Sequence, residues 1–485
     1  MSSQPNAAAE SVLARAAARC RERGVVIPTL AEMRNPARIP EKIRQRLGKV
    51  HLWDVDPVNL FRITWKNDPK TGLFNDGNWL EFPPELTGID ARVIGLVGKW
   101  FPTGSHKVGA GFGCLVPRLV TGQFDPTTQV AVWPSTGNYC RGGAFDCALL
   151  GCRSLAILPE EMSRERFEWL RSIGAEIIAT PGCESNVKEI YDECWNIRKT
   201  RPECVIFNQF EEFGNPIWHY HVTGAIIDEL FTRLAGPGDR LAGFASATGS
   251  AGTIGAADFL RTRHPSLRVA AVEALQCPTL LQNGFGAHRI EGIGDKHVPW
   301  IHNVRNTDFV AAIDDAQCLA IMRLFNEPEG QTELERTGVP LALVEQLPLL
   351  GISGICNLVA AIKMARFYEM DRRDVIFVPL TDSMELYQSR LQERRQERGL
   401  YDREQAVAAH QRWLLGAVPD HVRELGYQDR KALHNLKYFT WVEQQGRTVE
   451  DLRRLWDPDF WVETYAVAEE WDRQIDTFNA RVAAG

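Results

Sequence analysis

The sequence predicts an α/β fold with mostly parallel sheets, followed by a helical C-terminal appendage. Short apolar runs of strand length alternate with amphipathic helical patterns through the middle of the chain. This alternation implies parallel strands joined by right-handed helical crossovers. After residue 385 the apolar runs give way to highly charged segments with helical spacing, which indicates a separate helical part.

Composition narrows the classes of function. The 485 residues are 44% hydrophobic and 24% charged, which is ordinary for a soluble globular protein of about three domains. A formal net charge of −7 without basic blocks argues against binding a nucleic-acid backbone. No apolar stretch approaches the length of a membrane span, and the N-terminus lacks the apolar run of a secretory signal. We therefore expect neither nucleic acid nor membrane as a partner.

Cysteine and histidine usage gives no sign of a metal site. The 11 cysteines are scattered and form no C-x-x-C pair, so neither a zinc ribbon nor a disulfide framework is predicted. We interpret them as reduced thiols in a cytoplasmic protein. His219 and His221 lie two residues apart, but no third ligand is apparent, so we expect core or hydrogen-bonding histidines and no metal.

The N-terminal part is predicted to be a helical leader. Residues 1–48 are charged and helical in pattern, with breaks at Pro28, Pro36 and Pro40. A loop-rich stretch then runs to about residue 88 and carries the turn signals NDPKTG and NDGNW.

Seven apolar runs in the middle of the chain have the length and composition of β-strands. Each fits a strand that is buried on both faces of a sheet. The runs are residues 129–135, 153–159, 176–180, 204–210, 240–247, 268–274 and 374–380.

The helix between the second and third of these runs is specified in detail. In MSRERFEWLRSIGA, the side chains of Phe167, Leu170 and Ile173 share one face. Ser163 can cap the N-terminus of this helix and Gly174 can end it.

The C-terminal appendage, residues 386–485, is predicted to be helical. Its charge run indicates a solvated helix face, and it holds five of the 14 tryptophans of the chain. Exposing that many large aromatic side chains would be unusual for a monomer. We therefore expect the tryptophans to dock the appendage on the core or on a second subunit.

The first segment with a chemical signature is WFPTGSHKVGAGFG, residues 100–113. It places Lys107 in a Pro/Gly/Ser loop that leads into a helix of small residues. A lone lysine is usually a surface residue, but here the neighbours Val108, Gly109, Ala110 and Gly111 are apolar or small. A partly dry site lowers the pKa of an amine and makes it a competent nucleophile for imine formation.

Two further segments are turns that can hold an anion. WPSTGNYCRGGA, residues 133–144, joins a buried strand to a helix through a Ser-Thr-Gly-Asn turn. ASATGSAGTIGAADFL, residues 245–260, is a Gly/Ser/Thr loop between a strand and a helix, an arrangement that cradles phosphate. It matches neither a P-loop nor a G-x-G-x-x-G fingerprint. Each turn alone is also compatible with a simple strand–helix connection.

Taken together, these segments resemble the fold-type II pyridoxal-phosphate enzymes, in the branch of cysteine synthase and cystathionine β-synthase. PTGSHK resembles the family's PTGS-x-K segment, and STGN resembles its TSGN loop. NQFEEFGNPIWHYHVTG, HRIEGIGDKHVP and GISGICNLVAA resemble further segments in collinear order, from about residue 57 to 385. The departures are Tyr139 where the family has Thr, a phosphate loop one residue longer, and GISGI in place of GISSGA.

The resemblance implies pyridoxal 5'-phosphate as the cofactor and assigns residues to it. Lys107 would form the Schiff base and move the α-proton, Asn138 would bond the phenolic oxygen, and Ser353 would face the pyridine nitrogen. The phosphate would be held by Gly249, Ser250, Ala251, Gly252 and Thr253. The substrate would be bound by Ser135, Thr136, Gly137, Tyr139, Gln209 and Gly292.

The resemblance also implies an architecture of two three-layer open sheets with the cofactor in the cleft between them. Residues 49–128 and 225–385 would form the larger cofactor-binding domain, and residues 129–224 a smaller mobile domain. The family forms homodimers, so we expect a homodimer here.

The implied reaction takes place at Cβ of a small amino acid of the serine, cysteine or O-acetylserine type. A neutral serine at the ring nitrogen gives a weaker electron sink than a carboxylate would, which favours expelling a β-leaving group to give an aminoacrylate. β-Replacement by a small nucleophile, as in cysteine synthase, is the leading interpretation. The alternatives are an α,β-elimination lyase, such as an ammonia-lyase or desulfhydrase, and a non-catalytic cofactor-binding scaffold.

Overall fold

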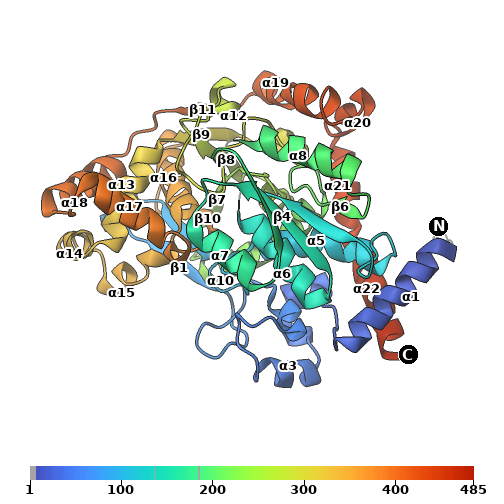
Figure 1. Ribbon diagram of the computed structural model, residues 1–485. Helices are drawn as coiled ribbons and strands as arrows, with labels where there is room; N and C mark the ends of the chain where they lie inside the picture. Colours follow the sequence, from blue (N-terminus) through green and yellow to red (C-terminus); the bar gives the residue numbers. More distant parts are fainter. Residues whose placement is uncertain (1–6, 136, 184–185, 485) are drawn as a thin grey trace.

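Two β-sheets form the centre of the molecule in the computed structural model, which describes residues 7–135, 137–183 and 186–484 (Figure 1). The larger sheet has the strand order β1-β2-β10-β7-β8-β9-β11. Its inner pairs are parallel, whereas the edge strands β1 and β11 pair antiparallel to their neighbours. Its strands are β1 (Trp79–Phe82), β2 (Arg92–Val97), β7 (Arg240–Ala247), β8 (Arg268–Ala274), β9 (Phe309–Ile313), β10 (Asp374–Leu380) and β11 (Val422–Glu424).

The smaller sheet is wholly parallel and has the order β5-β4-β3-β6. Its strands are β3 (Val130–Pro134), β4 (Arg153–Pro159), β5 (Glu176–Thr180) and β6 (Cys204–Ile206). The predicted α/β class with mostly parallel sheets is therefore confirmed.

The predicted strands match the observed ones closely, with two corrections. The run 204–210 shortens to β6, because at Phe207 the chain makes a last hydrogen bond to the carbonyl oxygen of Val132 and then turns. Burial on both faces was wrong for β5 and β6, which form the two edges of the smaller sheet and stay partly exposed. The sequence analysis missed β1, β2, β9 and β11.

Helices cover the sheets and build both chain ends. They are α1 (Ala7–Glu22), α2 (Leu30–Arg34), α3 (Glu41–Leu47), α4 (Pro84–Thr87), α5 (Lys107–Val120), α6 (Asn138–Leu150), α7 (Arg164–Ser172), α8 (Val187–Thr200), α9 (Gly214–Trp218), α10 (Ala225–Leu234), α11 (Ile254–Arg263), α12 (Thr279–Gln282), α13 (Asp315–Asn326), α14 (Pro328–Arg336), α15 (Leu341–Val344), α16 (Ile352–Phe367), α17 (Gln388–Arg398), α18 (Arg403–His410), α19 (Tyr427–Lys437), α20 (Val449–Arg454), α21 (Pro458–Ala466) and α22 (Ala468–Ala484). The leader is helical and is interrupted at the three predicted prolines.

Helix α7 confirms the predicted helix but not its cap. Phe167 and Leu170 are buried on its inner face, and Gly174 adopts the left-handed conformation just beyond its end. Ser163 occupies the N-cap position, but its hydroxyl makes no capping hydrogen bond, so that part of the prediction was wrong.

Small residues in α5 and α6 let these two helices pack closely beside the site. A Cβ atom added at Gly142 of α6 would lie 2.7 Å from the Cα of Val108 in α5, and one at Gly111 of α5 would lie 2.6 Å from Oδ2 of Asp146 in α6. Real Cβ atoms do not approach other atoms so closely, and interiors are too densely packed to yield. The glycines next to the lysine loop therefore serve helix packing.

The leader and the end of the appendage pack against each other, so the two chain termini lie on the same side of the molecule (Figure 1). The side-chain amide of Asn479 bonds both backbone groups of Ile27, at 3.0 and 2.8 Å. The carboxylate of Asp472 accepts a hydrogen bond from the backbone N–H of Leu30 at the start of α2, at 2.7 Å. Negative charge at a helix N-terminus is favourable, so this contact also stabilises α2.

The tryptophans of the appendage dock on this chain's own core. Trp441 and Trp461 are buried, and Trp413, Trp456 and Trp471 are partly buried. The indole N–H of Trp441 donates to the carbonyl oxygen of Val298 at 2.9 Å. In addition to its predicted helices, the appendage contributes the three-residue strand β11 to the larger sheet. None of the helices in the described part of the chain is long and apolar enough to cross a membrane.

We expect Trp441→Ala to destabilise the protein, because the indole is completely buried and its hydrogen bond would also be lost. Truncating a buried tryptophan typically lowers the free energy of unfolding by about 3–5 kcal/mol. Urea unfolding would measure the loss. The matched control is Trp195→Ala, because Trp195 is 36% exposed and its removal should change the midpoint little. Equal midpoints for both variants would contradict the docking role of Trp441.

Candidate active site

A narrow cavity lies at the carboxyl ends of the parallel strands, where loops of both sheets converge. Ligands bind at this edge in open α/β sheets because the strand-to-helix loops collect there. Ser135 follows β3, Ser246 and Ala247 end β7, and Thr381 follows β10. The full lining is His106, Lys107, Ser135, Asn138, Tyr139, Gln209, Ser246, Ala247, Gly249, Ala251, Gly252, Thr253, Gly292, Ile293 and Thr381.

Lys107 is the first residue of α5, and its amine reaches the opposite wall of the cavity. Its Nζ donates a hydrogen bond to the hydroxyl of Ser250 at 3.1 Å. Burial lowers the pKa of the amine to about 8, and the nearby carboxylate of Asp295 limits this shift. A substantial fraction of the amine is therefore neutral near neutral pH, as a nucleophile or a base requires.

The loop 249–253 forms an anion cradle in front of α11. Ala251 has a φ of 61°, a left-handed conformation that curls the backbone so that successive N–H groups can face one concavity. A Cβ at Gly252 would lie 2.0 Å from Oδ1 of Asn215, so no side chain fits there. Ser250 is held from behind by the side-chain amide of Asn215, at 3.0 Å. The cradle precedes a helix N-terminus, where negative charge is favoured.

The turn 135–139 supplies the other wall. The Ser135 hydroxyl accepts a hydrogen bond from the backbone N–H of Gly137 at 3.0 Å, which fixes the turn. Asn138 begins α6, and its side-chain amide donates to the carboxylate of Asp382 at 2.6 Å. Tyr139 packs edge-on against Trp133, and burial raises the pKa of its phenol well above the ordinary value. Thr136 lies outside the described residues.

Two predicted residues lie apart from the cavity wall. Ser353 is buried in the first turn of α16 and does not line the cavity. Gly137 does not line it either, and a Cβ there would lie 2.8 Å from the side chain of Arg166. The other predicted residues within the described chain line the cavity, or, for Ser250, contact Lys107 directly.

The sequence analysis missed His106 and Thr381 as lining residues. His106 is buried beside Lys107, and neither ring nitrogen has a hydrogen-bond partner among the described residues. Burial lowers the pKa of its imidazole well below the ordinary value, so the ring is neutral. Thr381 could have been found from its position, because it directly follows a predicted parallel strand.

These features fit pyridoxal 5'-phosphate. The aldehyde of this cofactor requires an amine, its phosphate requires an anion cradle, and its ring oxygen requires a donor. Lys107, the loop 249–253 and Asn138 provide these three functions around one cavity. No group of three metal-ligating side chains occurs in the described residues.

Comparisons with known proteins agree with this assignment. The family model described as "Pyridoxal-phosphate dependent enzyme" matches residues 101–354. A probable cysteine synthase of Bacillus subtilis is 28% identical over 230 residues, which are 47% of this chain and 72% of the relative. A cysteine synthase of Staphylococcus aureus is 28% identical over 232 residues, with the same coverage of each chain.

Solved structures show the same fold. A hydrogen sulfide-producing enzyme from Fusobacterium nucleatum superposes with a TM-score of 0.54 at 23% identity, over 64% of this chain and 96% of its own. An O-acetylserine-dependent cystathionine β-synthase from Helicobacter pylori gives a TM-score of 0.53 at 23% identity, over 64% and 94%. The cavity, its lysine and the family match together show that this chain belongs to the pyridoxal-phosphate-dependent enzymes.

Proposed function

We propose that the protein acts at Cβ of a small amino acid of the serine, cysteine or O-acetylserine type and catalyses β-replacement. The observation that carries this proposal is the amine of Lys107, with its lowered pKa, 3.1 Å from a hydroxyl of the anion cradle. The cysteine synthases among the relatives support the choice of reaction. A small nucleophile such as sulfide would be the second substrate.

We assign proton transfer and substrate binding to different residues of the cavity. Pyridoxal phosphate, when bound, supplies the sink for negative charge at the α-carbon. The neutral amine of Lys107 removes the α-proton and returns it, and burial keeps water from competing for that proton. Ser135, Tyr139, Gln209 and Gly292 surround the space left for the substrate, with Thr136 and Gly137 in the same turn proposed for its carboxylate.

Elimination without replacement is the second candidate function. Among the similar structures are hydrogen sulfide-producing enzymes, and one of these was solved with an α-aminoacrylate intermediate. Both reactions share the removal of the α-proton and the loss of the β-substituent, so the same residues support either outcome.

Thr381 is a second candidate, beside Ser353, for the hydroxyl that faces the ring nitrogen of the cofactor. Both carry a neutral hydroxyl, but Thr381 lines the cavity and Ser353 does not. A hydroxyl facing the ring nitrogen would not hold that nitrogen protonated, since its own proton is far less acidic than that of a carboxylic acid. This favours loss of a β-substituent over a long-lived charge at the α-carbon.

We further propose a cytoplasmic homodimer in which residues 129–224 form a smaller mobile domain. No disulfide joins two cysteines of the described chain, which suits a reducing compartment. The smaller sheet lies within residues 129–224, and the larger sheet is built from the chain on either side of them. Light scattering of the purified protein would give the number of subunits.

The reaction itself can be tested with a panel of donors. We expect O-acetylserine, serine or cysteine to change the visible absorbance of the holoenzyme, and sulfide to convert O-acetylserine or serine, whichever responds, into cysteine. Chromatography of the products with and without sulfide separates the two candidate functions. Keto acid and ammonia in equal amounts under both conditions would contradict replacement and support elimination.

We expect Lys107→Ala to abolish turnover and the covalent attachment of the cofactor, because the amine that forms the bond is removed. Activity should fall at least about 10³-fold, as for other catalytic groups. Absorbance spectra and turnover would measure both losses. The control is Lys99→Ala, since Lys99 forms a surface ion pair with Glu385 and lies outside the cavity wall. Full activity of Lys107→Ala would refute its assignment.

The pH dependence of cofactor attachment follows from the pKa of Lys107. Only the neutral amine reacts, so the rate of attachment to the apoenzyme should rise with pH, reach half of its maximum near pH 8 and level off about one to two pH units higher. Asp295→Asn removes a charge that favours the protonated amine, so the midpoint should move to lower pH. Stopped-flow absorbance would give both curves, with Glu335→Gln on the exposed end of α14 as the control. A midpoint that rises in Asp295→Asn would contradict this electrostatic account.

A further inference from the structure

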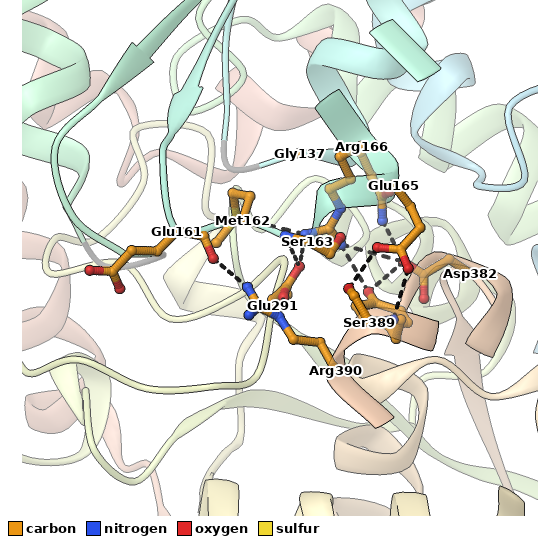
Figure 2. Close-up of polar contacts among 12 residues, drawn as sticks. Gly137, Glu161, Met162, Ser163, Glu165, Arg166, Glu291, Asp382, Ser389 and Arg390 are labelled. Carbon is orange, nitrogen blue, oxygen red and sulfur yellow. Dashed lines mark hydrogen bonds and ion pairs between the residues drawn. The ribbon is translucent and has the colours of Figure 1, made fainter. Parts of the chain in front are cut away.

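A buried cluster of charged and polar side chains lies directly behind the cavity wall. We call it the Arg166 cluster, and it consists of Asn138, Arg166, Glu291, Asp382, Tyr387 and Arg390. Figure 2 shows Arg166 of α7, Glu291 and Arg390 of α17 converging from three parts of the chain, with Asp382 beside them. Of these six residues only Asn138 lines the cavity. The other five can therefore influence a bound molecule only through Asn138 or through the loops that they contact.

A chain of hydrogen bonds runs from Arg166 to Asn138. A guanidinium nitrogen of Arg166 donates to the hydroxyl of Tyr387 at 3.0 Å, and that hydroxyl donates to Asp382 at 2.7 Å. The same oxygen of Asp382 accepts from the side-chain amide of Asn138 at 2.6 Å. The hydroxyl of Tyr387 and the side-chain amide of Asn138 thus both donate to one oxygen of Asp382.

This arrangement fixes which way the carboxamide of Asn138 points. A carboxylate only accepts hydrogen bonds, so the nitrogen of the amide, and not its oxygen, must face Asp382. The second N–H of that nitrogen remains for another acceptor, and Oδ1 has no partner among the described residues. A carboxamide that lines the cavity is therefore held in one orientation with unused bonding capacity.

Asp382 is buried among groups that favour its negative charge. Complete burial raises the pKa of its carboxyl, and the charge of Arg166 and the hydrogen bonds from Asn138 and Tyr387 offset part of this shift. Its backbone carbonyl accepts from the N–H of Gly351 at the start of α16, so the carboxylate also lies close to a helix N-terminus. Buried charges are costly unless paired in this way.

The cluster also reaches the loop that carries Gly292. Glu291, the residue before Gly292, forms ion pairs with Arg166 and with Arg390, whose Nε lies 2.6 Å from it. The preceding residue of α17, Ser389, donates to the carboxylate of Glu165 on α7 through its backbone N–H and its hydroxyl, both at 2.8 Å. The first helix of the appendage is thus tied to the loop that carries Gly292 and to α7.

We propose that Asp382 and Tyr387 are positioning residues: supported by Arg166, they hold the amide nitrogen of Asn138 toward the cofactor's ring oxygen. This inference rests on the proposed role of Asn138 at the cofactor. It gives the start of the C-terminal appendage a function in the site, because Tyr387 immediately precedes α17.

The test is a double-mutant cycle on the holoenzyme with Tyr387→Phe and Asn138→Ala. Tyr387→Phe removes one hydroxyl and keeps the ring. The readouts are the dissociation constant of pyridoxal phosphate, measured by equilibrium dialysis, and the pH titration of the visible absorbance of the bound cofactor. The matched control is Tyr465→Phe, because Tyr465 is equally buried and donates to Asp258 at 2.6 Å away from the cavity.

We expect Tyr387→Phe to raise the dissociation constant about fivefold and to shift the absorbance titration, while Tyr465→Phe changes only the melting temperature. In the Asn138→Ala background, Tyr387→Phe should have no further effect on either readout. A folded Tyr387→Phe with wild-type affinity and spectrum would overturn the proposal, and so would additive effects of the two substitutions.

The cycle also separates this inference from the assignment beneath it. If Asn138→Ala leaves affinity and spectrum unchanged, the role of Asn138 at the cofactor fails, and the positioning role fails with it. If Asn138→Ala has an effect and Tyr387→Phe has none, only the positioning role fails. Should Tyr387→Phe not fold, Asp382→Asn, which keeps the shape and removes the charge, replaces it in the same cycle with the same expected and contradicting results.

Discussion

The site depends on holding one lysine amine in a buried cavity within reach of an anion cradle. Burial lowers the pKa of Lys107 to about 8, and the hydroxyl of Ser250 is its nearby hydrogen-bond acceptor. Other buried lysines of this chain are held differently. Lys66 is paired with Glu229, and Lys437 donates to the carbonyl oxygens of Trp300 and His302. Burial lowers the pKa of Lys437 as well, but its amine is held by carbonyl oxygens away from the cavity, whereas the amine of Lys107 lies at the cavity beside the anion cradle.

The surrounding fold determines where the amine of Lys107 lies. The lysine opens α5, which packs on α6 through glycines, and α6 in turn begins with Asn138. Both helices start at the carboxyl edges of their sheets, so the amine, the amide and the cradle arrive at the same place. The Arg166 cluster then joins this edge to α17, which makes the appendage part of the architecture of the site.

Much of the site could be predicted because its residues lie in short contiguous segments of the sequence. The small residues around Lys107 and the loop 249–253 are contiguous, and their spacing reports on backbone shape directly. Thr381 could have been found from its place after a predicted strand, but the Arg166 cluster could not, since its members are far apart along the chain. Asn138 and Asp382 are separated by 244 residues, and only the strand order brings them together. The assignment of Ser353 to the ring nitrogen stays a prediction, because a motif at a helix start does not reveal which hydroxyl faces a bound cofactor.

The missed strands are of two kinds: β2 and β9 are apolar runs of six and five residues like those that were predicted, whereas β1 and β11 are short strands at the edges of the larger sheet. β11 has three residues and forms by pairing with β9 across more than a hundred residues of chain, which no local pattern encodes. For the tryptophans of the appendage, the sequence indicated burial but not the surface against which they pack. Their number indicated burial, but whether they pack on this chain or on another depends on the tertiary structure, which places Trp441 against Val298.

The central claim, that Lys107 carries the cofactor, is tested most directly by chemical reduction followed by peptide mass spectrometry. Borohydride fixes the bond between the cofactor and the amine that holds it, so the modified lysine can be identified after digestion. The account predicts one modified peptide, the one that contains Lys107. Modification of Lys66, Lys363 or Lys437 instead, or no modification in protein that binds the cofactor, would contradict it.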